Sequence, residues 1–334
     1  MLKWQPLIRI NKKSILRKHY ILIYKMKVIV TGGSGMIGKH LSELCPDFIY
    51  LSSKDCNLLN YESSLEYFKL LNPEFIIHFA AKVGGLYMNM NHNFDMLHNN
   101  LLINMNIMKI CKELKIKNFI GCLSTCIFPN NINYPITEEQ LHNGKPHDSN
   151  FGFSYGKRIL DIYCKEMNNN KDYNYVCIIP TNVYGENDNF NLKDAHVIPA
   201  LIHKCYLAKK NNKEFIINGS GKALRQFIYA GDLAKIIYFL VEKIRMNEIQ
   251  FQNIICSPDE KKEISIEYIV RKIASIFEYN NVVFDTSFSD GQYKKSVSNK
   301  RLKSIMPDIE FSEFDKCLKN TIYWFIENFD NLRK

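Results

Sequence analysis

An apolar stretch that runs into regularly spaced glycines constrains this chain more than any other feature. Residues 28–38 read VIVTGGSGMIG, in which four β-branched residues lead into the spacing G-x-x-G-x-x-G, and helix-compatible residues 39–44 follow. A strand, a glycine turn and a helix in this order bind the pyrophosphate of a dinucleotide, because the glycines allow close backbone approach and the helix N-terminus offers free N–H groups. An ordinary glycine-rich turn is the alternative. The predicted cofactor-binding residues here are Gly32, Gly35, Met36, Ile37 and Gly38.

Strand-like and helix-like segments alternate through the first half of the chain. Further strands are predicted at 48–51, 75–79, 119–123 and 176–179. Helices are predicted between them at 61–71, 93–114 and 152–167. This alternation predicts an α/β fold, a Rossmann-type doubly wound parallel sheet with right-handed crossovers. Ligands bind at the carboxyl ends of the strands in such a sheet, so polar residues at those ends are the functional candidates.

The end of the second predicted strand bears on which dinucleotide binds. Residues 51–55 read LSSKD, so small hydroxyl side chains and a lysine precede the acid. A carboxylate at this place holds the ribose hydroxyls of NAD, whereas a cation accepts the 2′-phosphate of NADP. Ser53 and Lys54 therefore favour NADP, and an exposed turn lysine is the alternative.

Three parts are expected along the chain. Residues 1–25 hold seven Lys or Arg and no acid, which we interpret as a basic N-terminal extension, with a targeting leader as the alternative. Residues 26–180 are predicted to form an NADP-binding Rossmann domain. Residues 181–334 are predicted to form mainly a smaller C-terminal substrate-binding lobe, with some segments returning to the Rossmann domain.

Composition limits the other classes of function. The 334 residues are 46% hydrophobic, enough for a large core, and the formal net charge of +10 suits an anionic ligand such as a nucleotide. The lysines are scattered, so nucleic-acid binding is not expected. The ten cysteines form no C-x-x-C pair or zinc-spaced cluster, which favours a reducing compartment, taken as the cytoplasm, and no metal. No apolar run is long enough to span a bilayer, so no membrane partner is expected.

Two polar groups follow the fourth predicted strand and open the next helix. Residues 123–126 read LSTC, and residues 152–158 read GFSYGKR. Ser124 and Lys157 resemble the serine and lysine of the short-chain dehydrogenases, which act with a tyrosine, and the glycine motif narrows this to the extended members that act on nucleotide sugars. The resemblance implies that the tyrosine exchanges the carbonyl proton, the lysine acidifies that tyrosine and holds the ribose, and the serine hydrogen-bonds to the substrate oxygen.

Further motifs resemble those of the GDP-L-fucose synthases within this group. They are AAKVGG at 80–85, STCIFP at 124–129, PTNVYG at 180–185, DNF at 188–190, HVIP at 196–199, GSG at 219–221, RQF at 225–227 and DG at 290–291. They extend the resemblance over nearly the whole chain. The related nucleotide-sugar 4,6-dehydratases carry an acidic pair after the corresponding threonine, whereas Cys126 follows Thr125 here, which disfavours dehydration.

The resemblance implies NADPH-dependent 3,5-epimerisation and 4-reduction of GDP-4-dehydro-6-deoxy-D-mannose by a homodimer built on helices 93–114 and 152–167. The ketone acidifies the protons on carbons 3 and 5, and the family assigns the base to Cys126 and the acid to His196. A core cysteine and a capping histidine are the structural alternatives. The implied catalytic residues are Ser124, Cys126, Lys157 and His196. Other implied cofactor-binding residues are Ala80, Lys157, Pro180, Asn182 and Val183. The implied substrate-binding residues are Asn182, Lys204, Asn218, Arg225 and Asp290.

The sequence departs from the family pattern at the proton donor. The family places tyrosine four residues before the lysine, and counting back from Lys157 gives Phe153. Tyr155 is only two residues before Lys157, which turns its side chain about 200° away from that of Phe153 on a helix. Three interpretations stay open: Ser124, Lys157 or a water relays the proton; Tyr155 reaches the site through an irregular first turn; or reduction is impaired while epimerisation survives. Another nucleotide-sugar epimerase or dehydratase, or a non-catalytic NADP-binding relative, is the alternative function.

Overall fold

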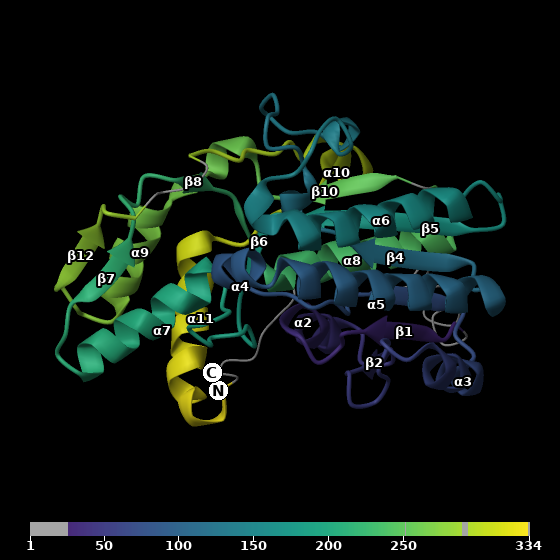
Figure 1. Cartoon of the computed structure of the whole chain (residues 1–334), viewed down its shortest axis with the longest axis horizontal. Helices are drawn as coiled ribbons and strands as arrows, with labels where there is room; N and C mark the ends of the chain where they lie inside the picture. The colour runs from purple at the N-terminus through teal and green to yellow at the C-terminus, as the bar shows by residue number, and fades with distance from the viewer. Residues whose placement is uncertain (1–25, 251, 289–292, 333–334) are drawn as a thin grey trace.

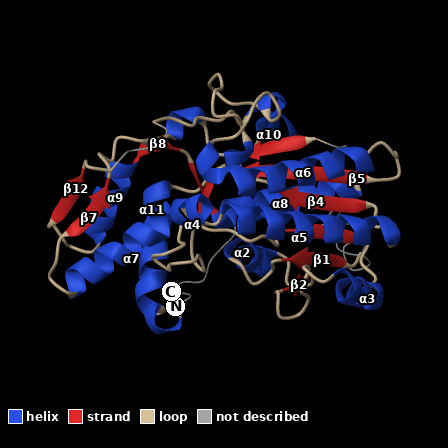
Figure 2. Ribbon diagram, viewed as in Figure 1, coloured by secondary structure: helices blue, strands red, loops and turns tan. Residues whose placement is uncertain are grey.

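A computed structural model describes residues 26–250, 252–288 and 293–332. The basic segment 1–25 and the predicted substrate residue Asp290 lie outside the described residues. Six parallel strands form the central sheet, flanked by helices on both faces (Figures 1 and 2). In spatial order the strands are β10 (Asn253–Cys256), β5 (Asn174–Pro180), β4 (Asn118–Cys122), β3 (Phe75–His78), β1 (Val28–Thr31) and β2 (Ile49–Leu51).

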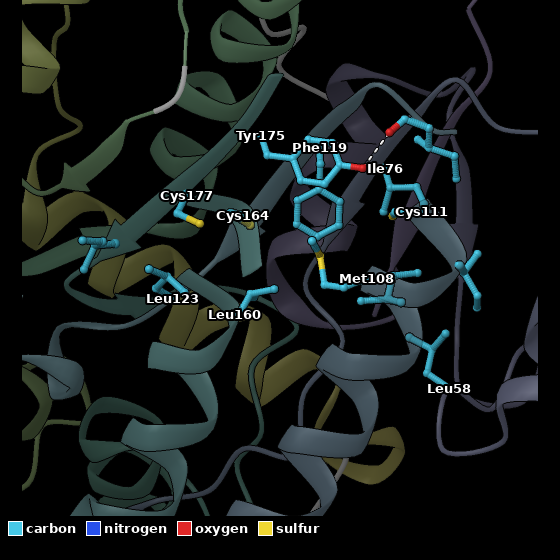
Figure 3. Close-up of a cluster of buried hydrophobic side chains, with 14 of the residues drawn as sticks. Leu58, Ile76, Met108, Cys111, Phe119, Leu123, Leu160, Cys164, Tyr175 and Cys177 are labelled. Carbon is cyan, nitrogen blue, oxygen red and sulfur yellow. Dashed lines mark hydrogen bonds between the residues drawn. The ribbon is translucent and has the colours of Figure 1, made fainter. Parts of the chain in front are cut away.

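The two faces of the sheet bury alternate residues of each strand, as a doubly wound sheet requires. One face packs against α3 (Tyr61–Leu71), α5 (Asn93–Glu113) and α6 (Phe151–Met167). The other packs against α2 (Met36–Leu44) and α8 (Ala230–Arg245). Figure 3 shows the first core, where the Phe119 and Tyr175 rings stack with centroids 5.1 Å apart. The Tyr175 hydroxyl donates to the backbone oxygen of Ile116 (2.6 Å), so this buried polar group is satisfied.

A smaller lobe follows the fifth strand and has a core of its own. Its helices are α7 (Val197–Lys210), α9 (Ile266–Ile276) and α11 (Phe314–Glu327). Three two-stranded sheets accompany them: β6 (Asn182–Tyr184) with β9 (Phe227–Tyr229), β7 (Phe215–Asn218) with β12 (Val282–Asp285), and β8 (Leu224–Arg225) with β11 (Ile264–Ser265). The short helices α4 (Leu86–Asn91) and α10 (Lys300–Ile305) complete the α-helices of the described chain.

The predicted fold class is confirmed, and the predicted helices lie within a few residues of their observed bounds. The sixth strand, β10, extends the sheet beyond β5 and was not predicted from the sequence. Its four residues contain only a short apolar run, Ile254–Cys256, which periodicity alone does not assign to a sheet formed mostly from another part of the chain.

Candidate active site

The glycine stretch forms a tight turn between β1 and α2 at the carboxyl edge of the sheet. Gly32 has φ +69, and a Cβ there would lie 2.7 Å from the backbone nitrogen of Ala80, at the end of β3. A Cβ on Gly38 would lie 2.6 Å from the Cα of Gly33, so α2 can approach the turn only because residue 38 is glycine. Gly35 precedes α2 without a side-chain cap, which leaves the first N–H groups of Met36 and Ile37 available to an anion.

After β2, the side chain of Lys54 is exposed, whereas the carboxylate of Asp55 is hydrogen-bonded within its own turn. Asp55 accepts hydrogen bonds from the Ser52 backbone nitrogen (2.8 Å) and hydroxyl (2.6 Å), and these bonds lower the pKa of Asp55. Ser53 and Lys54 are exposed beside this turn. The carboxylate is therefore occupied within its own turn, while the Lys54 ammonium is accessible to a phosphate.

Cys126 lies just beyond β4, in the short helix η1 (Thr125–Ile127). Ser124 caps this turn by accepting from the Cys126 backbone nitrogen (3.4 Å). Two buried side chains of α6 donate hydrogen bonds to the backbone of this turn. Ser154 Oγ donates to the Cys126 oxygen (2.9 Å), and Arg158 Nε donates to the Ile127 oxygen (2.7 Å). Cys126 is the one partly exposed thiol among the ten cysteines, because the other nine are buried.

Lys157 and Phe153 share one face of α6, as the four-residue spacing predicts. The buried Lys157 Nζ donates to the Cys122 oxygen (2.7 Å) and lies 5.8 Å from the centre of the Phe153 ring. Tyr155 faces elsewhere: its ring lies 4.7 Å from that of Phe151 and 5.5 Å from the Arg158 guanidinium. Since α6 is already helical from Phe151, the prediction that Tyr155 reaches the site through an irregular first turn is wrong.

A second lysine, which the sequence analysis missed, lies beside Cys126. Lys295 is half-buried in a recess, and this burial lowers its pKa, which the nearby Cys126 thiol opposes and Arg225 reinforces. Burial also lowers the pKa of Lys157, against the opposing influence of the Cys122 and Cys126 thiols. Both lysines therefore lie close enough to the Cys126 thiol for their charges to interact with it. Lys295 is not part of any local sequence motif. It belongs to the C-terminal part of the chain, and only the tertiary fold places it near Cys126, which follows β4.

The remaining predicted catalytic residue, His196, lies directly before α7. Its side chain is exposed to solvent within a recess of the protein, and this partial desolvation lowers its pKa, while Asp194 opposes the shift. The loop before His196 is held against the end of β3, where the Gly85 backbone nitrogen donates to the Asp194 oxygen (2.7 Å). Within the described residues no hydrogen bond or ion pair joins His196 to Cys126, so the two groups are free to act separately.

Two of the predicted substrate residues line one groove of the smaller lobe. Lys204 on α7 and Asn218 at the end of β7 lie on its walls, and the groove has a volume of about 290 Å³. A second hollow, of about 350 Å³, opens at the opposite edge of the central sheet, where Lys117 and Asn118 begin β4. It lies at the wrong edge for ligand binding by this fold, since parallel sheets bind at the carboxyl ends of their strands.

Four more predicted binding residues lie in or at the ends of strands β5, β6 and β8: Pro180, Asn182, Val183 and Arg225. Arg225 Nη1 donates to the oxygens of Leu224 (2.7 Å) and Tyr293 (3.3 Å). Asn182 Nδ2 donates to the Gln226 oxygen (2.9 Å), which ties β6 to the strand beside it. Pro180 ends β5 and is buried, and Val183 follows in β6.

Comparison with known proteins points to the same kind of site as the glycine turn, the α6 lysine and the doubly wound sheet. The model of the NAD dependent epimerase/dehydratase family matches residues 28–252. The chain belongs to this family. The matched residues include the glycine turn, Cys126 and Lys157.

Within the epimerase/dehydratase family, the chain is similar to named GDP-L-fucose synthases. It is 42% identical to the GDP-L-fucose synthase of Dictyostelium discoideum over 93% of this chain and 98% of the relative. It is 40% identical to a probable GDP-L-fucose synthase of Drosophila melanogaster over 92% and 99%. The crystal structure of a GDP-L-fucose synthetase from Naegleria fowleri bound to NADP matches with a TM-score of 0.85 and 38% identity, covering 93% and 95% of the two chains. These relatives confirm the predicted resemblance.

In the part of the chain that the structure describes, no helix has the length and apolarity needed to cross a membrane. Among the same residues, no three His, Cys, Asp or Glu side chains are grouped as a metal ion would require.

Proposed function

We propose that the chain converts GDP-4-dehydro-6-deoxy-D-mannose to GDP-L-fucose by epimerisation at carbons 3 and 5 and NADPH-dependent reduction at carbon 4. The observation that carries this proposal is the environment of Cys126. The thiol is partly exposed at the carboxyl edge of the sheet, two residues after Ser124, with Lys157 and Lys295 beside it. A thiol facing cations is suited to removing a proton from carbon.

The epimerisation needs a base and an acid at different sides of the sugar ring. The substrate ketone acidifies the protons on carbons 3 and 5, and Cys126 removes them in our proposal. His196, which the Gly85 contact holds at the start of α7, returns protons from the other side. The half-buried Lys295 ammonium faces the oxygen that gains negative charge when a proton leaves.

The cofactor site fits NADPH. The Gly32 turn has no room for a Cβ, the N-terminus of α2 offers uncapped N–H groups, and Lys54 is accessible for a 2′-phosphate. When bound, NADPH supplies the hydride that reduces carbon 4. The side-chain donors left to protonate the carbon-4 oxygen are Ser124, Lys157 and Lys295, since Phe153 has no hydroxyl and Tyr155 faces away.

We further propose that the chain forms a homodimer through α5 and α6. These helices pack side by side, since Asn104 Nδ2 on α5 donates to the Gly156 oxygen on α6 (3.0 Å). Large apolar side chains remain exposed on them: Phe94 (75%), Met105 (44%), Phe151 (42%) and Ile162 (44%). Exposed apolar side chains grouped on neighbouring helices are typical of an interface.

Product analysis tests the proposed activity. The purified chain is incubated with GDP-4-dehydro-6-deoxy-D-mannose and NADPH, and the nucleotide sugar is examined by mass spectrometry and NMR. We expect a product two hydrogens heavier than the substrate with the configuration of L-fucose. A 4-epimerase would leave the mass unchanged, and a dehydratase would lower it by one water. A non-catalytic relative, which Phe153 favours, would bind NADPH without turnover.

A further inference from the structure

The groove of about 290 Å³ in the smaller lobe is built from two regular faces. Side chains of α7 at helical spacing form one wall, and the outward side chains of β7 form the other, because burial alternates along that strand. Leu192 lies on the chain leading to α7. The lining residues are Leu192, Lys204, Leu207, Ala208, Asn211, Lys213, Glu214, Ile216 and Asn218.

Apolar side chains in this groove are exposed, although nothing in the described chain covers them. Ile216 is 44% and Leu192 42% exposed. A flat heteroaromatic base between such walls removes this apolar surface from water. The aliphatic side chains among the lining residues supply the contact with the base.

The groove runs outward from the active site along α7. His196 directly precedes this helix, and with a rise of about 1.5 Å per residue Lys204 lies about 12 Å and Asn211 about 22 Å further along. Glu214 follows the C-terminus of α7 and precedes β7, so it lies at the outer end. A nucleotide sugar with its sugar at His196 and its diphosphate near Lys204 would place its base beside Glu214.

The Glu214 carboxylate has no hydrogen bond or ion pair with the residues that the structure describes, and its side chain is exposed in the groove. An ionised carboxylate only accepts hydrogen bonds. Guanine presents two adjacent donors, N1–H and the 2-amino group, which a carboxylate accepts together. Adenine and uracil offer no such pair, and hypoxanthine keeps N1–H but lacks the amino group.

We propose that Glu214 selects guanine by accepting hydrogen bonds from N1–H and the 2-amino group of the base. This inference rests on the proposed function, because it assumes that the groove holds the nucleotide half of the substrate. It adds a specificity-determining residue that lies outside the catalytic centre and outside the motifs shared with the family.

The test measures the binding of free nucleoside diphosphates to the full chain saturated with NADP⁺, which keeps them out of the dinucleotide site. Isothermal titration calorimetry with GDP, IDP and ADP compares the bases. We expect GDP to bind about tenfold more tightly than IDP, because a hydrogen bond to a charged partner contributes on this scale. Glu214→Gln should weaken GDP binding about tenfold and abolish the preference over IDP. The matched control Glu62→Gln, on the exposed side of α3, removes the same charge and should change neither.

The outcomes separate this inference from the proposed function. If GDP binds and the GDP-to-IDP ratio is unchanged in Glu214→Gln, the base-selecting role of Glu214 is wrong while the proposed activity stands. If the unmodified chain binds no GDP at all, both are wrong. Circular dichroism of the variant excludes unfolding as the cause of lost binding.

Discussion

Phe153 stands four residues before Lys157, where the family pattern places the tyrosine that gives a proton to the substrate carbonyl. Phe153 is only 9% exposed, and its ring centre lies 5.8 Å from Lys157 Nζ on the same face of α6. The side chain differs from tyrosine by one oxygen, so the packing needs little change to accept a hydroxyl. Its absence removes a general acid from the reduction but no group from the epimerisation.

Restoring that hydroxyl should accelerate reduction. A positioned general acid contributes about 10² to 10⁴ in rate, and since Ser124 and Lys157 already offer protons, we expect Phe153→Tyr to raise the rate about tenfold or more. Stopped-flow NADPH oxidation with the keto sugar measures it. Tyr155→Phe removes a hydroxyl that faces away from Lys157 and is the matched control, with no change expected. An unchanged rate in Phe153→Tyr would show that another group already donates efficiently.

Some residues of the candidate site could be predicted from the sequence, and others could not. The position of Phe153 follows from helix periodicity and the spacing to Lys157, so it could be predicted. The glycine turn could be predicted for the same local reason, although the tight approach of Gly38 to Gly33 was missed. Lys295 could not be predicted, because only the tertiary fold brings it beside Cys126.

At the scale of elements, β3 ends in a buried imidazole that connects the glycine strand to α5. His78 Nε2 donates to Asn104 Oδ1 (3.1 Å), which leaves Nδ1 to accept from the Thr31 hydroxyl (2.7 Å). Both nitrogens are therefore satisfied by the neutral ring. Burial, and secondarily the charge of Lys157, lowers the pKa of His78 to about 3.

This depressed pKa makes stability depend on pH. An unfolded histidine has a pKa near 6.5. Between pH 6.5 and about pH 3, His78 therefore binds a proton in the unfolded chain but stays neutral in the folded chain. The contribution of His78 is thus complete above pH 6.5 and falls by about 1.4 kcal/mol per pH unit below it. Between pH 7 and pH 5 we expect the free energy of unfolding to fall about 2 kcal/mol more for the natural chain than for His78→Gln, in urea titrations.

A control separates His78 from the other titrating groups. His98 has an exposed side chain on α5, so His98→Gln should keep the pH dependence of the natural chain. Equal pH dependence for His78→Gln and the natural chain would mean that the folded ring has the pKa of an unfolded histidine, contrary to its burial between Thr31 and Asn104.

The segment 293–299 carries Lys295 across the site, and the buried side chain of Gln226 holds it there. The Val297 nitrogen donates to Gln226 Oε1 (2.7 Å), while Gln226 Nε2 donates to the oxygens of Val297 (3.2 Å) and Pro258 (2.9 Å). On the other side, the Ile136 nitrogen donates to the Ser296 oxygen (2.9 Å). Gln226 therefore acts as a positioning residue for Lys295.

Loosening this segment should weaken substrate handling without affecting the cofactor. For Gln226→Ala we expect kcat/KM for the keto sugar to fall about tenfold, since a misplaced charged group loses a hydrogen bond worth about 1.5 kcal/mol. The Kd of NADPH, measured by fluorescence, should be unchanged. Gln250→Ala alters an exposed glutamine and serves as the control. A matching loss of NADPH affinity would instead indicate general unfolding.

At the scale of the whole molecule, the alternation of strands and helices was enough to predict the larger lobe. The smaller lobe was harder, because its strands are two to four residues long and pair in three separate two-stranded sheets. Short strands carry little periodicity, and their pairing depends on contacts between distant segments. Of the groove between α7 and β7, only Lys204 and Asn218 were therefore predicted from the sequence.

The proposed dimer can be tested in solution. Light scattering at micromolar concentration should give about 78 kDa, twice the 39.1 kDa of one chain. The paired substitutions Met105→Glu and Ile162→Glu place charges on the exposed faces of α5 and α6 and should shift the mass to that of one chain. Leu70→Glu, at an 82% exposed position on α3, should leave it unchanged. A single-chain mass for the unmodified protein would refute the dimer.

Solvent deuterium tests most directly the claim that Cys126 and His196 exchange protons on carbon before reduction. The chain is incubated with GDP-4-dehydro-6-deoxy-D-mannose and NADPH in D₂O, and the product is analysed by mass spectrometry and NMR. We predict GDP-L-fucose with deuterium at carbons 3 and 5 and hydrogen from NADPH at carbon 4, and no deuterium on carbon with Cys126→Ala. A reduced product that carries no deuterium at carbons 3 and 5 when made by the unmodified chain would contradict the account.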